Sequence, residues 1–204
     1  MRPLTQHTPK PLLKVGGKTL LEHQISFLEE HVQSIAVTVG YKSDQVSKMA
    51  LEKGINFIIN NFGGGNANWL NIPLVREMDS QVVVITCDNL MEIDFKKIKL
   101  ELSLKNRNNY IFTRNCGEGL SGDRINANEG RIDSVSPTNK STSLATGLQI
   151  INPRTLTPNV NFTNFHEVWS DSMSTNSLFE STVHPSKWLA IDTPTDLENA
   201  NRDL

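Results

Sequence analysis

The chain has 204 residues, of which 37% are hydrophobic, and its mean hydropathy of −0.33 is typical of a globular protein. Lys and Arg number 20 and Asp and Glu 22, which gives a formal charge of −2 with no block of like charges. This balance argues against nucleic acid or a membrane surface as the main partner. The two cysteines lack CxxC spacing, no signal peptide follows Met1, and no stretch is apolar over the width of a bilayer. We therefore expect a reduced, cytoplasmic protein with one domain over residues 1–204.

The first half of the chain alternates between helical and strand patterns. Apolar residues recur at helical spacing from Leu20 to Leu28, and Thr19 with Glu22 has the spacing of a capping box. Pro73 has to lie in a later helix or kink it. The elements expected in chain order are a helix from residue 20, a strand at 34–40, a helix at 43–53, a strand at 55–59, a helix at 66–77 and a buried strand at 81–87.

After residue 88 the pattern changes. Strands at 123–128 and 131–135 flank Glu129-Gly130, which resembles a hairpin turn. The other expected elements are a helix at 95–104, strands at 110–114 and 144–151, a helix at 165–175, a strand at 189–191 and a final helix opened by Thr193 and Pro194. Strands that alternate with helices and then form a hairpin predict a three-layer α/β/α domain with a mixed, mostly parallel sheet.

Two aspartates follow strands of the expected sheet. Asp88 comes after the strand at 82–86 and Asp192 after the strand at 189–191, and ligands of open α/β sheets bind beyond the carboxyl ends of the strands. Carboxylates there would hold Mg²⁺ against nucleotide phosphates, and Lys10 would offset charge at an α-phosphate. The alternatives are a turn former or helix cap for either aspartate and a solvated surface position for the lysine.

Glycines mark two further candidate binding segments. Gly63, Gly64 and Gly65 would cradle a base or a phosphate with their backbone N–H groups, and the alternative is a flexible turn. Thr146 and Gly147 lie inside an expected strand, where a glycine indicates either close approach of a ligand to the backbone or a β-bulge.

Three segments of the sequence resemble the sugar-phosphate nucleotidyltransferases, which make an NDP-sugar from an NTP and a sugar 1-phosphate. Residues 2–21, RPLTQHTPKPLLKVGGKTLL, are similar to the family block RPLT…TPKPLL.VGGKPLL. Residues 188–197, WLAIDTPTDL, are similar to W.DIGTPEDL, and residues 82–88, VVVITCD, resemble a family strand that ends in Gly-Asp. The first block resembles that of mannose-1-phosphate guanylyltransferases and of MurNAc/GlcNAc-1-phosphate uridylyltransferases.

The resemblance implies a Rossmann-like nucleotidyltransferase fold of the GT-A-like kind. It also implies that Lys10 is the phosphate-binding lysine, that Asp88 and Asp192 bind magnesium, and that Gly147 lies against the sugar. The implied partners are an NTP and a sugar 1-phosphate. The implied products of the Mg²⁺-dependent reaction are pyrophosphate and an NDP-sugar or a related activated alcohol.

The chain departs from the family pattern in four places, one of which is Val135-Ser-Pro137 where many members have Glu-Lys-Pro, so that a second phosphate lysine is missing unless Lys140 substitutes for it. The first strand and the Gly-rich phosphate loop, which ends in Gly-x-Arg, are absent before Arg2, so we expect an N-terminally truncated chain with impaired activity. Cys87 replaces the usual glycine before the metal aspartate. The run Gly63-Gly-Gly-Asn-Ala-Asn68 stands where many members have Gly-Thr-Ala-Gly.

Two other function classes fit parts of this pattern. A regulatory paralogue would bind a nucleotide or nucleotide-sugar without turnover, but it has no reason to retain both metal carboxylates. A glycosyltransferase of similar architecture usually has Asp-x-Asp after the corresponding strand, which the run Asp88-Asn89-Leu90 lacks. The sequence leaves open the base, the sugar and whether copies assemble into a homo-oligomer.

Overall fold

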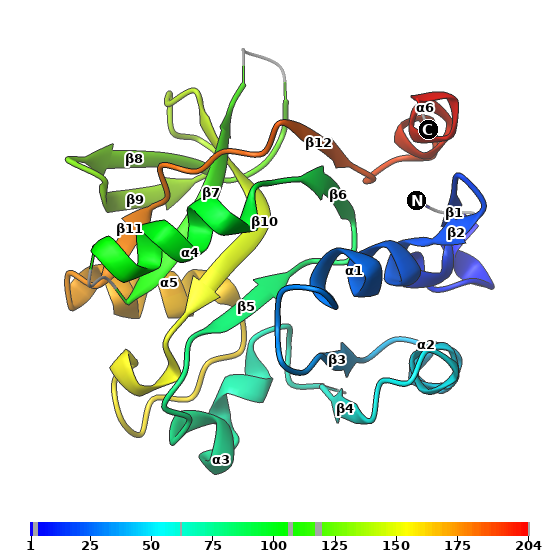
Figure 1. Ribbon diagram of the computed structural model, residues 1–204, viewed down its shortest axis with the longest axis horizontal. Coiled ribbons are helices and arrows are strands. Elements are labelled where there is room, and N and C mark those ends of the chain that lie inside the picture. Colours follow the sequence, from blue (N-terminus) through cyan, green and yellow to red (C-terminus); the bar gives the residue numbers. More distant parts are fainter. Residues whose placement is uncertain (2–3, 62, 106–107, 117–119, 204) are drawn as a thin grey trace. The chain divides into compact units, whose positions relative to one another are not determined.

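The computed structural model describes residues 1, 4–61, 63–105, 108–116 and 120–203 (Figure 1). The chain divides into two compact units. Unit 1 comprises Met1–Gly65, Thr86–Met91 and Lys187–Leu204, and unit 2 comprises Asn66–Ile85 and Glu92–Ser186. The expectation that residues 1–204 make one domain stays a prediction. None of the described helices is both long and apolar enough to cross a membrane.

Unit 1 opens with a small hairpin whose turn requires glycine. Strands β1 (Lys14–Val15) and β2 (Lys18–Thr19) pair antiparallel across Gly16 and Gly17, whose φ angles are 57° and 85°. Two positive φ angles in a two-residue hairpin loop are the mark of a type I′ turn, which glycine adopts without a steric cost. The Gly-Gly pair therefore turns the chain back so that helix α1 can start directly after β2.

Helix α1 (Leu20–Leu28) begins as its sequence predicts. The Thr19 side chain accepts from the Glu22 backbone, and the Glu22 side chain accepts from the Thr19 backbone, so the expected capping box is confirmed. The face with Leu21 and Ile25 packs into a buried cluster with residues of the following β3, α2 and β4 region. The structure of α1 thus agrees with both sequence patterns that predicted it, the capping box at its start and the apolar face that packs into the core.

The rest of unit 1 combines a parallel strand pair with the chain's last segment. Strand β3 (Ala36–Val39), helix α2 (Ser43–Glu52) and strand β4 (Phe57–Asn60) form a crossover in which β3 and β4 pair parallel. Strand β6 (Asn89–Glu92) pairs with β12 (Lys187–Ala190), which leads to α6 (Pro194–Asp203). A second buried cluster joins these distant segments; its members are Leu13, Val15, Leu20, Leu90, Ile191 and Ala200.

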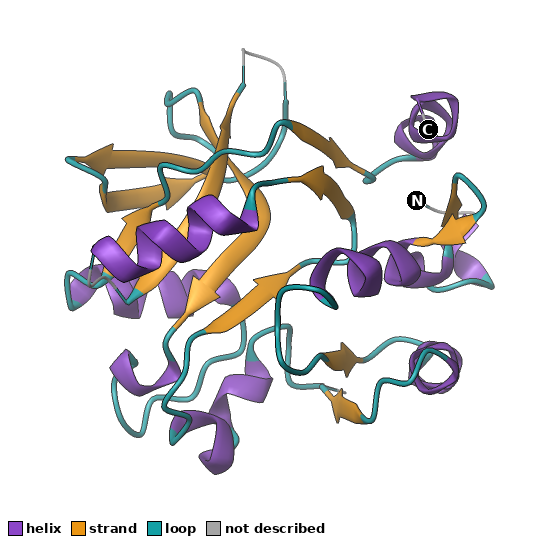
Figure 2. Ribbon diagram, in the orientation of Figure 1, coloured by secondary structure: helices purple, strands orange, loops and turns teal. Residues whose placement is uncertain are grey.

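Unit 2 is built on a six-stranded sheet with the order β5-β10-β7-β11-β9-β8. Figure 2 shows this sheet as a set of long strands, with helix α4 in front of it and α5 behind it. The strands are β5 (Val82–Ile85), β7 (Asn109–Asn115), β8 (Arg124–Asn128), β9 (Arg131–Ser136), β10 (Ser143–Ile151) and β11 (Leu178–Glu180). The helices are α4 (Phe95–Leu104) and α5 (Phe165–Ser174). Trp169 and Met173 of α5 pack against the buried sheet cluster that contains Ile111 and Ile132.

The mixed α/β fold class is confirmed, but the expectation of a mostly parallel sheet is wrong for unit 2. Only β11 and β7 pair parallel among the pairings described there, and the others are antiparallel. The reason is topological. Antiparallel strands can be joined by short turns such as Glu129-Gly130 between β8 and β9, whereas each parallel pair needs a crossover.

The helix expected at residues 66–77 is also wrong. The chain forms a 3₁₀ turn, η3 (Asn68–Asn71), and then a single-turn helix, α3 (Pro73–Arg76). Ile72 between them is extended, with φ −67° and ψ 123°, because a residue before proline avoids the helical region. Pro73 therefore starts a new helix instead of kinking a long one.

Candidate functional site

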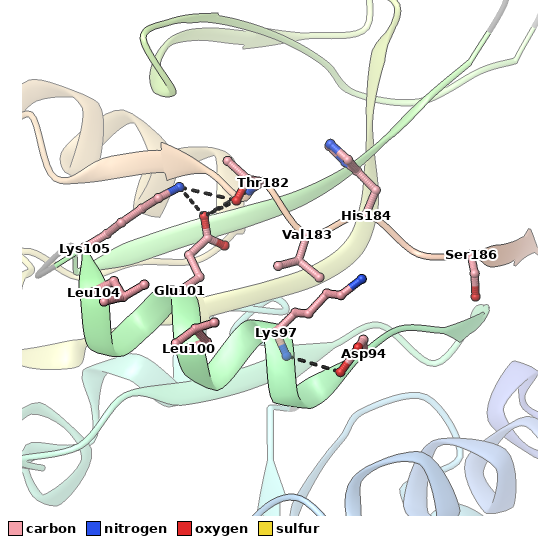
Figure 3. Close-up of a pocket in the computed structure, with 10 residues that line it drawn as sticks. All are labelled: Asp94, Lys97, Leu100, Glu101, Leu104, Lys105, Thr182, Val183, His184 and Ser186. Atoms are coloured by element: carbon pink, nitrogen blue, oxygen red, sulfur yellow. Dashed lines mark hydrogen bonds and ion pairs between the residues drawn. The ribbon is translucent and has the colours of Figure 1, made fainter.

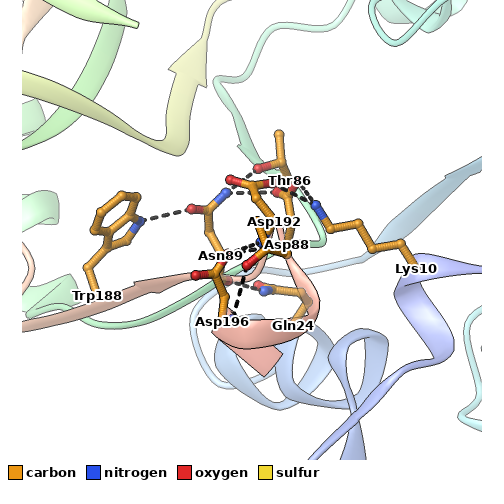
Figure 4. A network of polar contacts seen from close by, with 9 residues as sticks. Lys10, Gln24, Thr86, Asp88, Asn89, Trp188, Asp192 and Asp196 are labelled. Atoms are coloured by element: carbon orange, nitrogen blue, oxygen red, sulfur yellow. Dashed lines mark hydrogen bonds and ion pairs between the residues drawn. The ribbon is translucent and has the colours of Figure 1, made fainter. Parts of the chain in front are cut away.

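Lys10, Asp88 and Asp192 meet at one point of unit 1 (Figure 4). The Lys10 Nζ atom donates to Asp88 Oδ2 and to Asp192 Oδ1, at 2.9 Å in both cases. These two carboxylate oxygens are therefore separated by no more than twice that distance. The expected convergence of two acidic side chains and an amine, contributed by three distant segments, is present in the structure. Their roles in binding metal and phosphate stay predictions.

Lys10 is positioned by a proline-rich turn. Pro9 caps the 3₁₀ turn η2 (Lys10–Leu12), where the Leu12 backbone donates to the Pro9 carbonyl at 2.9 Å. Leu13 then enters the buried cluster of unit 1. Pro9 has φ fixed near the value that it shows here, −63°, so the backbone of Lys10 is held while its long side chain extends to the carboxylates. The preceding Arg2 and Pro3 of the family-like block lie outside the described residues.

Asp88 is held by the neighbouring Asn89. The Asn89 side-chain amide donates to Asp88 Oδ1 at 2.8 Å and to Thr86 Oγ1 at 2.6 Å. Its own oxygen accepts from the indole N–H of Trp188 at 2.9 Å, and its backbone carbonyl accepts from the Gln24 side chain. Asn89 and Trp188 are both buried. Sequence reasoning missed Asn89 as a site residue, although it is adjacent to Asp88.

Asp192 is held by the start of helix α6. The backbone N–H groups of Asp192 and Thr193 donate to Asp196 Oδ2 at 3.0 and 2.7 Å, and the Asp196 N–H donates to Thr193 Oγ1 at 3.1 Å. This reciprocal pair caps the helix. The Asp192 carboxylate is not needed for the cap, so the helix-cap alternative does not account for it. Its contact in this unit is with Lys10.

Charge pairing outweighs burial at this site. Burial is the largest single influence on Lys10 and lowers its pKa, but hydrogen bonds to Asp88 and Asp192 and their charges together raise the pKa above its ordinary value. Burial likewise acts to raise the pKa of Asp88, yet the hydrogen bond and charge of Lys10 and the Thr86 contact lower it overall. The lysine is therefore a cation and Asp88 an anion at neutral pH.

Cys87 lies next to Asp88 but has the wrong chemistry for a nucleophile. Burial, and then the negative charge of Asp88, raise the pKa of the Cys87 thiol to about 12. A thiol with that pKa is protonated at neutral pH, and the thiolate is the reactive and metal-binding form. The cysteine at this position therefore does not add an activated nucleophile.

The oxygen atoms of the site fit a hard divalent cation. Asp88 and Asp192 already present oxygens to a common cation, the Lys10 ammonium, so the donor set and its convergence suit Mg²⁺. Among the described residues there is no group of three or more His, Cys, Asp or Glu that would hold a metal ion. Mg²⁺ bound by Asp88 and Asp192 would thus complete its coordination with water and phosphate oxygens, as it commonly does.

The two glycine segments are not joined to this site by the described contacts. Gly63 and Gly65 have φ angles of 75° and 77°, and the Gly64 N–H donates to the Asn61 carbonyl at 2.8 Å, so the turn alternative is realised. Positive φ explains the glycines at 63 and 65 without a ligand. Their proposed contact with base or phosphate stays a prediction.

Thr146 and Gly147 belong to β10 in unit 2. Thr146 is buried and its hydroxyl donates to the Phe112 carbonyl at 2.8 Å. Gly147 has a φ of 80° within the part of β10 whose pairing with β7 shifts register, so the bulge alternative is realised at this position. A role for either residue in contacting the substrate stays a prediction.

Unit 2 contains a cavity of about 420 Å³ beside helix α4 (Figure 3). One wall is formed by Lys97, Leu100 and Leu104 of α4, and the other by the segment from Thr182 to Ser186. None of its lining residues was predicted from the sequence as a site residue. One of the carboxylates in its wall, Glu101, is engaged in bonds to Lys105 and Thr182 and so holds the cavity wall together.

Comparison with curated proteins gives two sets of relatives, although no family model matches the chain. Over 92 residues the chain is 34% identical to a choline-phosphate cytidylyltransferase of Streptococcus pneumoniae. Over 46 residues it is 37% identical to the bifunctional protein GlmU of Methanococcus maripaludis. The chain is a homologue of both proteins. The first match covers 45% of this chain and 40% of the relative, and the second 22% and 11%, so each is a similarity to part of a protein.

The solved structures are similar to this chain over almost its whole length. A Bacillus anthracis protein described as a glucose-1-phosphate thymidylyltransferase, in complex with sucrose, matches 99% of the chain and 89% of its own, with a TM-score of 0.78 at 18% identity. The phosphocholine cytidylyltransferase LicC of S. pneumoniae matches 100% and 92%, with a TM-score of 0.69 at 19% identity. At these identities the likeness shows the fold, and the fold is that of nucleotidyltransferases. The resemblance read from the sequence is confirmed.

Proposed function

We propose that the protein transfers a nucleotidyl group from an NTP to the phosphate of a sugar 1-phosphate, or of a related phosphorylated alcohol, and releases pyrophosphate. The observation that carries this proposal is the meeting of the Lys10 ammonium with the carboxylates of Asp88 and Asp192. One homologue and one structural neighbour support it, because a choline-phosphate cytidylyltransferase and a glucose-1-phosphate thymidylyltransferase are named for a nucleotide and a phosphorylated alcohol. We expect the reaction to take place in the cytoplasm.

The reaction requires charge stabilisation more than proton transfer. An oxygen of the acceptor phosphate attacks the α-phosphorus, a new P–O bond forms, and the bond from the α-phosphorus to the leaving pyrophosphate breaks. Lys10 would bind the phosphate oxygens on which charge accumulates. Asp88 and Asp192 would hold Mg²⁺, which supplies positive charge to the phosphates when it is bound.

The surrounding residues would fix the two carboxylates in place. Asn89 restrains Asp88 through its side-chain amide, and the Thr193–Asp196 cap restrains the backbone at Asp192. Such preorganised groups lower the barrier because they do not have to reorient as charge develops. The buried hydrogen bond from Trp188 to Asn89 in turn keeps the amide pointed at Asp88.

The test is pyrophosphate release from each of four NTPs with Mg²⁺, combined with choline phosphate, glucose 1-phosphate, N-acetylglucosamine 1-phosphate or mannose 1-phosphate. We expect release with a preferred pair and a requirement for both substrates. Equilibrium binding of the same NTPs is measured in parallel. Binding without release for any pair would overturn the proposal in favour of a regulatory nucleotide-binding protein. Neither binding nor release would also contradict it.

A further inference from the structure

Lys10 uses one oxygen of each of the two aspartates that would share a metal ion. Its ammonium donates to one oxygen of each aspartate, Asp88 Oδ2 and Asp192 Oδ1. The other Asp88 oxygen, Oδ1, is already engaged by the Asn89 amide. The Asp88 oxygen that the Asn89 amide does not engage is therefore the one that Lys10 uses.

We propose that Lys10 is a placeholder counter-ion, which neutralises the two carboxylates when no metal is bound and moves to a substrate phosphate when a divalent cation takes its place. This inference rests on the proposed function. It assigns Lys10 two alternating partners, where the proposed function alone gives it one.

The ammonium and a divalent cation do not fit together at these oxygens. Mg²⁺ binds carboxylate oxygens at roughly 2.0–2.1 Å, so an ion shared by Asp88 and Asp192 would lie close to an ammonium that is 2.9 Å from both. A metal ion and an ammonium that contact the same carboxylate oxygens repel each other, and the repulsion increases where water is partly excluded. The Lys10 side chain is only 23% exposed, so screening by water at this site is incomplete.

Of the three side chains, Lys10 has the longest and most flexible stem. Asp88 is restrained by Asn89, and Asp192 follows the capped start of α6. The hydrogen bonds recorded for the Lys10 ammonium within the described chain are those to the two carboxylates. A lysine has a flexible four-carbon stem, so its head group can leave the carboxylates while its backbone stays in η2.

The exchange makes the binding of metal and nucleotide cooperative. A metal ion alone has to compete with Lys10, which then loses both of its carboxylate partners. A metal ion that arrives with a nucleotide also brings phosphate oxygens that accept the displaced ammonium. Metal and nucleotide would thus raise each other's affinity, and Lys10 would be the group that couples them.

The experiment is calorimetric titration of MgCl₂, without nucleotide, into the full chain and two variants. Lys10→Met removes the charge and keeps an unbranched side chain, and Lys18→Met is the control because Lys18 is exposed on β2. We expect Lys10→Met to bind Mg²⁺ about tenfold more tightly than the unmodified chain, within the usual range of coupling between sites. We expect Lys18→Met to bind as the unmodified chain does. Lys10→Gln replaces Lys10→Met if circular dichroism shows that the latter does not fold.

Equal or weaker Mg²⁺ binding by the Lys10 variant would overturn the inference, and so would no binding by either protein. The result is separable from that of the pyrophosphate assay. Tighter binding by Lys10→Met without pyrophosphate release for any substrate pair would support the placeholder role and contradict the proposed function. Pyrophosphate release by the unmodified chain, together with unchanged Mg²⁺ binding in Lys10→Met, would support the proposed function and contradict the placeholder role.

Discussion

The two units of the molecule each contain a carboxylate with a lysine partner, and the carboxylates are held in different ways. In unit 2, Glu101 is 6% exposed and accepts from the Thr182 backbone, the Thr182 hydroxyl and Lys105, at 3.0, 2.8 and 2.7 Å. In unit 1, the Asp192 side chain is 58% exposed, and its recorded side-chain bond in the described chain is to the flexible Lys10.

This difference separates a structural carboxylate from a candidate functional one. Glu101 is saturated by groups that belong to the fold, so replacing any of them leaves a buried polar atom without its partner. The partner of Asp192, and of Asp88 Oδ2, is the Lys10 ammonium, which a divalent cation would replace under the proposed exchange. A carboxylate whose partner is exchangeable is the kind that metal binding can use.

The largest effect on activity is expected at Asp88 and Asp192, the carboxylates whose cation partner would be exchanged. Asp88→Asn or Asp192→Asn should lower the rate of pyrophosphate release by about 10²–10³-fold, comparable to losing one preorganised charge-stabilising group. For Asp192→Asn stability should change little, because the Asp192 side chain is 58% exposed and an exposed ion pair contributes about 0–1 kcal/mol. The matched control is Asp44→Asn, an exposed aspartate in the first turn of α2. An unchanged rate in either variant would exclude that residue as a metal ligand.

Removal of the Asn89 amide, which restrains Asp88, should lower the stability of the protein. Asn89→Ala leaves the buried Trp188 indole N–H and Thr86 hydroxyl without the Asn89 side chain. We expect the free energy of unfolding to fall by about 1–3 kcal/mol, the usual effect of leaving a buried polar group unpaired. Urea unfolding measures this change, with the exposed Asn126→Ala as the control. Equal stability of the two variants would show that the Asn89 bonds do not restrain the site.

Replacing Glu101, the structural carboxylate of unit 2, should lower stability without lowering activity. Glu101→Gln replaces an acceptor oxygen by an NH₂ group that faces hydroxyl and ammonium donors. We expect unfolding to become easier by about 1–3 kcal/mol, while pyrophosphate release per folded molecule stays unchanged. Loss of activity with unchanged stability would contradict the distinction between the two carboxylate sites.

The smallest effect concerns the helix start in unit 1. The Lys53 ammonium, then the Thr19 backbone and side chain, lower the pKa of Glu22 from its ordinary value of 4.5 to about 2. The ionised form is thus favoured in the folded state. Its contribution is complete above pH 4.5 and is lost as the pH falls from there through about 2.

Glu22→Gln should remove this pH dependence. Because Glu22 is close to solvent, we expect the effect on the free energy of unfolding to stay below about 1 kcal/mol. Urea unfolding of the unmodified chain and the variant at pH 6 and pH 3 measures it. A difference between the two proteins that is the same at both pH values would contradict this assignment.

Local features of the fold were predictable from the sequence, and long-range side-chain contacts were not. The capping box of Thr19 and Glu22 spans three residues, so spacing alone indicates it. The helix at 66–77 failed because Pro73 sets a boundary that apolar spacing does not register. The capped start of α6 and the hairpin at Glu129-Gly130 are likewise local and were expected.

The candidate site was predictable only with the help of the family-like blocks. Lys10 is separated from Asp88 by 78 positions and from Asp192 by 182, and no periodic pattern reports on such distances. The order of the three family-like segments, 2–21, 82–88 and 188–197, placed all three residues at one site. Asn89 and Trp188 were missed as a pair because their hydrogen bond joins strands that are 99 positions apart and depends on the fold.

The most direct test of the account is pyrophosphate release by the unmodified chain with its preferred substrate pair, measured with Mg²⁺ and again after removal of divalent ions with EDTA. The account predicts that release requires Mg²⁺, that EDTA abolishes it and that added Mg²⁺ restores it, since the carboxylates of Asp88 and Asp192 would act through the ion. Release that continues at the same rate in EDTA would contradict the assignment of these two aspartates.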